Sequence, residues 1–334
     1  MFTERTTIGL DVHARSVIAA ALDTHTGELV QRRLTPDFTD ITTFITHQPQ
    51  PAAVVYEAGP AGFGLVRHLT DAGIRCVVAA LSKLQRPAGD RVKTDKNEAL
   101  HLAKLLRLDE VTPVDVPSLV QESARDLVRT REDACGDLMS ARHRLSKLLL
   151  RHGIVYYGGS AWTGKHDQWL HTDALPRLPD TATRLGFDAA YDAVLTVTAR
   201  RDRLDAEIEK IARDSEFTAV VDRLGCLRGI GTLTGFGLAV EIGDWTRFTG
   251  RTIGSYVGLA PTEYSSGSSR SQGGVMKTGN GHVRRLLIEV AWHHRRQYRK
   301  SKALQARFDR APAAARARGD EGNRRLHNHE PFSN

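Results

Sequence analysis

Short apolar runs alternate with helix-like stretches along the first third of the chain. Strands are expected at residues 7–13, 16–23, 28–34, 52–57 and 74–79, and helices at residues 37–47, 60–71 and from about 94 onward. Gly27 suits a hairpin turn between the second and third strands. The resulting β-β-β-α-β-α-β-α succession predicts an α/β domain over residues 1–112, with a mixed sheet covered by helices.

Four acidic residues stand where an apolar strand ends or where the last of these helices begins. Asp11 and Glu57 lie at strand ends, and Asp95 and Glu98 are three residues apart, on one face of a helix. Carboxylates from several elements suit Mg²⁺, and paired ions can stabilise the attacking and leaving oxygens of a phosphodiester. Their positions match the metal-binding acids of an RNase H-like (RuvC-like) fold. Any one of them alone is more simply a cap or a surface charge.

A helical hairpin is expected after two prolines that end the first domain, Pro113 and Pro117. Apolar positions recur at helical spacing over residues 119–152 and 191–214, with a loop at 153–179 between them. We interpret residues 117–215 foremost as a coiled-coil spacer or dimerisation arm. The alternative is a nucleic-acid clamp, because basic and aromatic residues lie along it. These residues are Arg142, Arg144, Lys147, Trp162, Lys165, His166 and Trp169.

The third block, residues 216–302, combines glycine turns, serines and arginines. Gly229 and Gly231 form a turn before an apolar helix that ends at Ile242, in the manner of a helix-hairpin-helix that meets a phosphate, although a tight helix connection explains them equally well. A serine loop then precedes a helix predicted over 282–300. Candidate nucleic-acid contacts here, beside the serines Ser265 and Ser266, are Gly229, Gly231, Arg270, Lys277, Arg284 and Arg285.

Charge is unevenly distributed along the chain. Residues 1–116 carry 13 basic against 14 acidic side chains, whereas residues 251–300 carry nine against two. The basic stretch predicts a surface that faces a polyanion. No apolar run reaches membrane-spanning length, the first residues lack the order of a signal peptide, and the three cysteines lack metal-ligand spacing. We therefore expect a cytoplasmic protein with no membrane partner.

The motifs, taken in order, resemble the transposases of the insertion sequence 110 family, which are bridge-RNA-guided serine recombinases with a DEDD RuvC-like domain. The resemblance spans roughly residues 7–300. The motifs that carry it are Gly9-Leu-Asp11-Val-His13, Tyr56-Glu57-Ala-Gly-Pro60, Lys93-Thr-Asp95-Lys-Asn-Glu98-Ala99, Gly229-Ile-Gly231, Gly258-Leu-Ala-Pro-Thr-Glu-Tyr-Ser-Ser-Gly267 and Lys277-Thr-Gly-Asn280.

The resemblance implies a DNA transposase or recombinase in which Asp11, Glu57, Asp95 and Glu98 hold Mg²⁺. It implies that a serine attacks DNA and forms a covalent phosphoserine; Ser266 is preferred over Ser265 because the family pairs its serine with a glycine. It also implies a bridge RNA that pairs with donor and target DNA. The homodimer or homotetramer would combine one subunit's RuvC-like domain with another's serine domain.

Two departures from the family pattern keep alternatives open. Glu98 stands where the family usually has Asp, and the Arg- and Ala-rich tail at 303–334 is typical of a disordered or truncated end. One alternative is a metal-dependent junction nuclease that needs no serine. A second is an inactive, nucleic-acid-binding remnant of a transposase. A third is an actin-like sugar kinase or ATPase, because Gly9-Leu-Asp11 also resembles the first phosphate loop of that fold.

Overall fold

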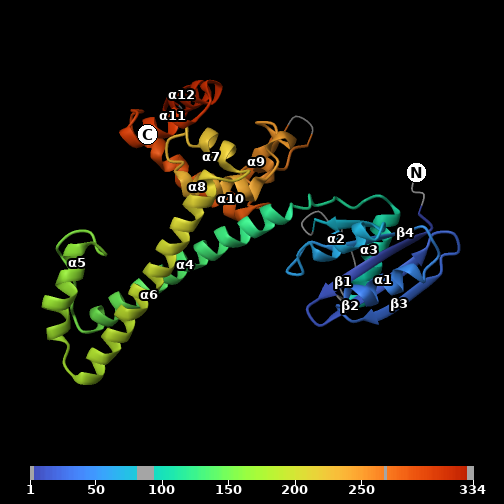
Figure 1. Cartoon of the computed structure of the whole chain (residues 1–334), viewed down its shortest axis with the longest axis horizontal. Helices are drawn as coiled ribbons and strands as arrows, with labels where there is room; N and C mark the ends of the chain where they lie inside the picture. The colour runs from blue at the N-terminus through green and yellow to red at the C-terminus, as the bar shows by residue number, and fades with distance from the viewer. Residues whose placement is uncertain (1–3, 81–93, 267–268, 329–334) are drawn as a thin grey trace. The chain divides into compact units, whose positions relative to one another are not determined.

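The protein is described here by a computed structural model that covers residues 4–80, 94–266 and 269–328 (Figure 1). The chain divides into two compact units, unit 1 up to Ser118 and unit 2 from Leu119 onward. The division falls one residue after Pro117. Lys93 and Gly267, both parts of the motifs above, lie outside the described residues, as do residues 329–334 of the tail.

Unit 1 contains a five-stranded mixed sheet in the order β3-β2-β1-β4-β5. Strand β1 pairs antiparallel with β2 and parallel with β4, and β5 is parallel to β4. The strands are β1 (Thr6–His13), β2 (Ser16–Asp23), β3 (Leu29–Leu34), β4 (Ala52–Glu57) and β5 (Arg75–Ala79), and the helices are α1 (Phe38–Thr46), α2 (Gly64–Asp71) and α3 (Asp95–Arg107). The predicted succession of elements and the mixed sheet are confirmed.

Side chains of β1 alternate between the two faces of this sheet. Ile8 and Leu10 are fully buried in a cluster with residues of α1 and α2. Gly9 faces α3 so closely that a Cβ atom there would lie 1.9 Å from the carbonyl oxygen of Ala99. Helix α3 therefore rests directly on the strand that carries Asp11. The same contact argues against the kinase alternative, because Gly9 is covered and leaves no room for a phosphate.

Unit 2 is built on a hairpin of two long helices, α4 (Leu119–Arg151) and α6 (Thr181–Arg213) (Figure 1). The early residue Val128 packs in one cluster with Ile208, whereas the late residue Leu145 packs in another with Phe187, so the helices are antiparallel. The predicted hairpin is confirmed. Helix α6 begins earlier than expected because the Asp180 side chain accepts a hydrogen bond from its first turn.

The connection between α4 and α6 is helical as well. It contains α5 (Gly164–Trp169), a π-helical turn at Leu170–Ala174 and a 3-10 turn at Leu175–Arg177. Leu170, Ala174 and Leu178 pack onto the ends of the two long helices. The segment expected to be a loop is therefore a folded cap on the hairpin tip, with α5 at the far end from the other helices of the unit (Figure 1).

The remaining elements gather at the opposite end of the hairpin (Figure 1). They are α7 (Thr218–Leu224), α8 (Thr232–Ile242), α9 (Thr252–Tyr256), β6 (Pro261–Glu263), β7 (Gln272–Val275), α10 (Gly281–Trp292), α11 (Lys302–Arg310) and α12 (Ala313–Asn328). Helix α8 is the central one, with Phe236, Leu238 and Val240 fully buried. No helix in the described parts of the chain is long and apolar enough to cross a membrane.

Two expectations for this region differ from the structure. The helix predicted over 282–300 ends at Trp292 and continues as a 3-10 turn, because the carbonyl groups of Arg296 and Gln297 accept hydrogen bonds from Arg228 instead of continuing the helix. The tail expected to lack order forms α11 and α12 up to residue 328. Leu304 and Phe308 are buried there beside Cys226, which anchors these helices.

Candidate functional site

The acidic side chains of unit 1 are brought together by strand β1 and helix α3. Thr94 caps α3 and starts it at Asp95, so this acid lies at the helix N-terminus. The potential ligand atoms of Asp11, His13 and Asp95 all lie within 4.8 Å of one another. The Asp11 side chain is 14% exposed, and its Oδ2 lies 3.1 Å from Nε2 of His13. This set of oxygen and nitrogen atoms can hold a divalent cation.

The electrostatics of Asp11 link the other helix acid, Glu98, to the same cluster. Partial burial raises the pKa of Asp11, the hydrogen bond and charge of His13 act to lower it, and the negative charges of Asp95 and Glu98 act to raise it again. The balance leaves the pKa of Asp11 above its ordinary value. A bound cation would remove this mutual repulsion, which is why such clusters favour metal ions.

Glu57 is not among the three residues whose ligand atoms lie within 4.8 Å of one another, but the register of the sheet places it beside Asp11. Leu10 pairs with Tyr56 in the parallel β1–β4 ladder, so Asp11 and Glu57 follow at the carboxyl ends of adjacent strands. Val55, two residues earlier on β4, packs against α3, which places the half-buried Glu57 on the same face of the sheet. We call Asp11, Glu57, Asp95 and Glu98 the acidic corner.

His13 is a member of the metal cluster to which the sequence reasoning assigned no chemistry. It lies two residues after Asp11 on β1, so both side chains project from the same face of the strand. The pattern Asp-x-His at a strand end was the available signal.

The two candidate serines lie on an exposed hairpin in unit 2, which we call the serine hairpin and which consists of β6, β7 and the residues between them. Ser266 forms a pair of backbone hydrogen bonds with Ser269, both 3.1 Å long. The Ser265 hydroxyl donates to Oε1 of Glu263 over 2.7 Å. Both serines are exposed, so a large substrate can reach either hydroxyl.

The two backbone segments at the base of the serine hairpin pack closely against each other. Gly258 and Gly279 both have positive φ, and a Cβ atom at Gly279 would lie 1.9 Å from the carbonyl oxygen of Tyr256. Only glycine permits these two segments of the backbone to cross so closely. Arg284 links the same two segments, because its Nη1 donates to the carbonyl oxygens of Val257 and Thr278 over 2.9 and 3.0 Å.

A buried carboxylate connects this base to the helical core. Glu241 on α8 is 1% exposed; it accepts hydrogen bonds from Nε and Nη2 of Arg129 over 3.0 and 3.2 Å and from the Asn280 amide over 2.8 Å. Burial acts to raise the pKa of Glu241, but these hydrogen bonds and the Arg129 charge hold it below its ordinary value. Asn280 in turn caps α10, so the carboxylate fixes where the hairpin meets this helix.

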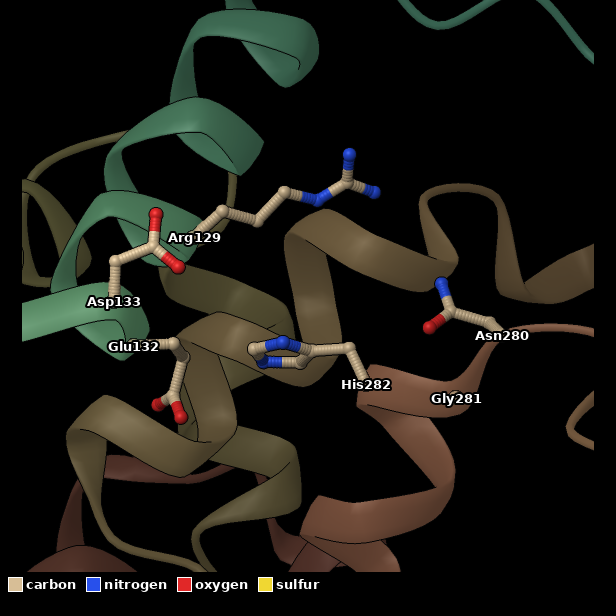
Figure 2. A pocket seen from close by; sticks show the side chains of 6 residues that line it. All are labelled: Arg129, Glu132, Asp133, Asn280, Gly281 and His282. Atoms are coloured by element: carbon tan, nitrogen blue, oxygen red, sulfur yellow. The ribbon is translucent and has the colours of Figure 1, made fainter. Parts of the chain in front are cut away.

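Figure 2 shows the pocket of about 620 Å³ that opens beside this network. Helix α4 supplies Arg129, Glu132 and Asp133 from one side, and the start of α10 supplies Asn280 and His282 from the other. Burial lowers the pKa of His282, although the charges of Glu241 and Glu132 act to raise it. The pocket lies in the same unit as the serines and includes none of the acidic corner.

Several predicted phosphate contacts have partners within the protein. Arg284 holds two backbone carbonyls, as described, and Arg285 bridges Glu132 and Glu289. Arg270 lies 3.6 Å from the Glu263 carboxylate, whereas Lys277 is exposed. Gly231 precedes the first residue of α8 with no side-chain cap, as the turn hypothesis expected, and Gly229 packs against His293.

The candidate nucleic-acid contacts of the helical arm differ in their exposure. Arg144, Lys147 and Lys165 are exposed, but Arg142 lies over the Trp162 ring at 5.1 Å and its buried Nε has no hydrogen-bond partner among the described residues. His166 is 5% exposed within an aromatic cluster that also contains Tyr156, Trp162 and Trp169. These rings pack together at the hairpin tip, and His166 is too buried to contact nucleic acid in the clamp alternative.

Comparisons with known proteins agree with these two sites. Residues 8–154 match a family profile described as a transposase of the DEDD type of insertion sequence 110, and residues 221–307 match one described as the transposase IS116/IS110/IS902 family. The first profile covers the acidic corner and the second covers the serine hairpin.

Named relatives give the same result. A Sinorhizobium fredii protein that carries the transposase name y4qE is 35% identical over 78% of this chain, which spans 63% of that relative's length. The transposase of IS1533 from Leptospira borgpetersenii is 28% identical over 96% of this chain and 94% of its own length. That of IS1328 from Yersinia enterocolitica is 25% identical over 86% of this chain and 83% of its own length. The chain belongs to the IS110 family of transposases.

Proposed function

We propose that this protein is a DNA transposase that cuts and rejoins DNA with the help of Mg²⁺ bound at the acidic corner. The observation that carries the proposal is the cluster of Asp11, His13 and Asp95, where the charge of Glu98 also acts on Asp11. The β1–β4 register, which sets Glu57 at the neighbouring strand end, supports it. A site rich in hard oxygen ligands suits Mg²⁺, which keeps part of its water shell for substrate phosphate. The strand order β3-β2-β1-β4-β5 supports an RNase H-like assignment of unit 1.

In this proposal Asp11, Glu57, Asp95 and Glu98 hold the metal, and the metal supplies charge neutralisation at the scissile phosphate. Glu98 has the longer side chain where the family usually has Asp. Its side chain starts from the first turn of α3, and its charge acts on Asp11, which supports a place for it at the same metal. His13 orients the Asp11 carboxylate through its hydrogen bond.

The nucleophile in this proposal is Ser266. Its Oγ attacks phosphorus, a bond from serine to phosphate forms, and the bond from phosphorus to one deoxyribose oxygen breaks. The serine proton leaves with the departing alkoxide, and a hydroxyl of the new strand later displaces the serine. Ser265 is the less favoured choice, because its hydroxyl already donates to Glu263.

We further propose that the protein selects donor and target DNA through a bridge RNA and acts as a homodimer or homotetramer. The RNA and the oligomer are proposed because of the family membership. The described residues show no element that would read bases directly, which agrees with recognition by an RNA. A composite site would then join the acidic corner of one subunit to the serine hairpin of another. Recognition by base pairing leaves the protein to bind backbone and shape.

The test is a search for covalent protein–DNA adducts. Purified protein, Mg²⁺ and the RNA transcribed from the flanks of the element are incubated with labelled donor and target DNA and separated on a denaturing gel. Wild type should give an adduct that Ser266→Ala abolishes and Ser265→Ala retains. Ser269→Ala is the matched control, because Ser269 is also exposed and pairs with Ser266 across the hairpin. Adducts that persist in the double variant Ser265→Ala/Ser266→Ala would refute the serine mechanism.

A metal-dependent junction nuclease is the second candidate. It is favoured by one observation, that the candidate metal ligands Asp11, His13 and Asp95 all lie within unit 1 and include no residue of the serine hairpin. Such an enzyme would release ordinary hydrolysed ends with no protein attached. Cleavage that survives in both single serine variants would support it, whereas nucleic-acid binding without any cleavage would indicate an inactive remnant.

A further inference from the structure

Unit 2 contains a second pocket, of about 710 Å³, that is lined by three arginines and two aromatic rings. We call it the arginine pocket; its lining residues are Arg228, Trp292, His293, Arg295 and Arg296. It lies where the turn before α8 meets the 3-10 turn after α10. No lining residue is acidic, so the pocket favours an anion.

Some cations of the basic stretch are paired with carboxylates of the protein, as Arg285 and Lys300 are. Arg284, like Arg228 of the pocket, donates to backbone carbonyls. Within the described part of the chain, no carboxylate forms an ion pair with Arg228, Arg295 or Arg296. The arginine pocket therefore gathers three arginines whose charge no carboxylate balances, whereas Arg285, a predicted phosphate contact, is paired with Glu132 and Glu289.

An exposed aromatic ring stands among these cations. Trp292 is 63% exposed, which is unusual for the largest apolar side chain, and the Arg295 guanidinium lies 5.1 Å from the centre of its ring. Arginine stacked over tryptophan beside further cations is the combination that binds both parts of a nucleotide, its phosphate and its base.

The pocket is held in shape by contacts that involve its own backbone. Nη1 of Arg228 donates to the carbonyl oxygens of Arg296 and Gln297 over 2.7 and 2.9 Å, and its backbone N–H donates to Asn323 over 2.8 Å. Gly229, at φ 88°, packs so closely on His293 that a Cβ atom would lie 2.8 Å from the ring. The pocket therefore requires little ordering before it binds.

We propose that the arginine pocket binds an unpaired nucleotide of a single-stranded polynucleotide, with the phosphate between Arg228 and Arg296 and the base stacked on Trp292. This goes beyond the proposed cleavage chemistry and rests on it only for nucleic acid as the partner. The shared chemistry of a phosphate and an aromatic base fits RNA and DNA alike. Duplex DNA fits less well, because its bases are already stacked on one another.

The first test is the affinity for fluorescent single-stranded oligomers of thymidine and of uridine, measured by anisotropy over a range of salt concentrations. Trp292→Ala should weaken binding about 10-fold with little change in salt dependence, and Trp292→Tyr should restore most of it, because tyrosine also stacks. Arg295→Gln/Arg296→Gln should weaken binding and lower the slope of log affinity against log salt by about 0.7, for the one phosphate that Arg296 no longer helps to neutralise.

The matched control is Arg316→Gln/Arg318→Gln, which removes two exposed cations from α12 in the same unit. It should change affinity less than twofold, whereas equal losses in both double variants would overturn the pocket in favour of diffuse charge. Unchanged affinity in Trp292→Ala would overturn base stacking. A preference for the uridine oligomer identifies RNA as the ligand, and a preference for the thymidine oligomer identifies DNA. If a free mononucleotide competed as well as the oligomer, the proposal that the pocket binds a polynucleotide would be refuted.

The adduct assay separates this inference from the proposed function. Serine adducts together with oligomer binding that ignores the pocket variants would refute the arginine pocket alone. Pocket-dependent binding without any adduct would refute the serine chemistry and leave the pocket standing. Each variant is first checked for an unchanged thermal unfolding midpoint, so that loss of binding is not loss of fold.

Discussion

The acidic corner and the serine hairpin are held in place in different ways. The corner takes its groups from the ends of core elements, where Leu10 and Tyr56 are fully buried beside Asp11 and Glu57. The described residues of the serine hairpin are exposed except for the half-buried Thr262, and the hairpin is held at its base by Gly258, Gly279 and the Glu241 network. The acidic corner is positioned by packing on all its elements, whereas the serine hairpin is held only at its base.

The difference indicates how the two sites take part in the reaction. A metal site needs ligands fixed to a fraction of an ångström, which buried strand ends and a packed helix supply. An exposed nucleophile can approach a large substrate, but it lacks a surrounding shell that would orient it. We therefore expect the substrate or a partner subunit to complete the environment of the serine, and we expect mutations to act differently in the two regions.

The largest effect should come from Asp11→Asn. It removes one negative charge from a cluster whose acids repel one another, so a divalent cation loses much of its attraction. DNA cleavage should fall on the order of 10³-fold, which corresponds to the several kcal/mol that a metal ion contributes. Calorimetric titration with Mg²⁺ or Mn²⁺ should show the loss of binding directly.

The control for this change is Asp109→Asn, which alters an exposed acid just beyond the opposite end of α3 from Asp95. Asp109 has a positive φ of 57°, which asparagine tolerates well. Metal binding and cleavage should be unchanged. If Asp11→Asn retained both, the corner would be a structural cluster, and the contrast with the hairpin would lose its chemical meaning.

A pair of glycine substitutions tests the packing side of the comparison. Gly9→Ala places a methyl group 1.9 Å from a backbone oxygen and 2.7 Å from the backbone nitrogen of Ala103, so α3 must move. We expect a loss of about 3 kcal/mol of stability in unit 1 and a loss of metal binding, because Asp95 and Glu98 move with the helix. Gly274→Ala on β7 meets open space and should change stability by less than about 0.5 kcal/mol.

The measurement uses the placement of the chromophores. All four tryptophans lie in unit 2, so tryptophan fluorescence in urea follows that unit alone. Circular dichroism follows both units. Gly9→Ala should shift part of the dichroism transition and leave the fluorescence transition in place. Equal shifts in both signals would mean that the units unfold together.

A smaller effect is expected from Glu241, which joins the hairpin base to the core. Glu241→Ala removes the partner of Arg129 and Asn280 and should cost about 2 kcal/mol, less than a fully buried pair, because Arg129 is 57% exposed and regains water. Tryptophan fluorescence in urea reports it. Covalent adducts should decrease, since Asn280 no longer fixes the start of α10.

The same carboxylate gives a pH dependence of known sign. Because the pKa of Glu241 in the folded protein is below its ordinary value of 4.5, its stabilisation is complete above that pH and is lost as the pH falls through the folded value. Glu241→Gln has no such group to protonate, so acid should reduce its stability less than that of wild type. Identical acid losses in the two proteins would assign the effect to other carboxylates.

Much of unit 1 was predictable because its signals are local. Short apolar runs predicted β1 and β4, which are buried along most of their length, and the strand ends bring Asp11 and Glu57 to one edge of the sheet. The Thr94 cap placed Asp95 and Glu98 on α3 in the same way. Short-range patterns therefore sufficed for the sheet, whereas the metal-binding role of the acidic corner stays a prediction.

Unit 2 was harder to predict, because long-range contacts decide which of its cations are free. Arg285 meets Glu132, 153 residues away, and Arg228 ends the helical course after α10 by binding its carbonyls. No pattern within either segment indicates these partners. The tail shows the same limit, since its composition suggests disorder and yet Phe308 is buried against Cys226.

The smallest effect we expect is that of His13, and it tests whether this residue is a metal ligand or a positioning residue for Asp11. Its ring is 55% exposed, and Nε2 lies 3.1 Å from Asp11 Oδ2. If it only orients the carboxylate, His13→Gln, whose amide can donate the same hydrogen bond, should keep metal affinity within about threefold of wild type, while His13→Ala loses up to about tenfold. A direct ligand would instead show equal losses in both variants and a marked preference for Zn²⁺ over Mg²⁺ in wild type, since imidazole suits softer ions. Titration of the three proteins with both metals therefore decides whether the acidic corner is completed by nitrogen or by oxygen alone.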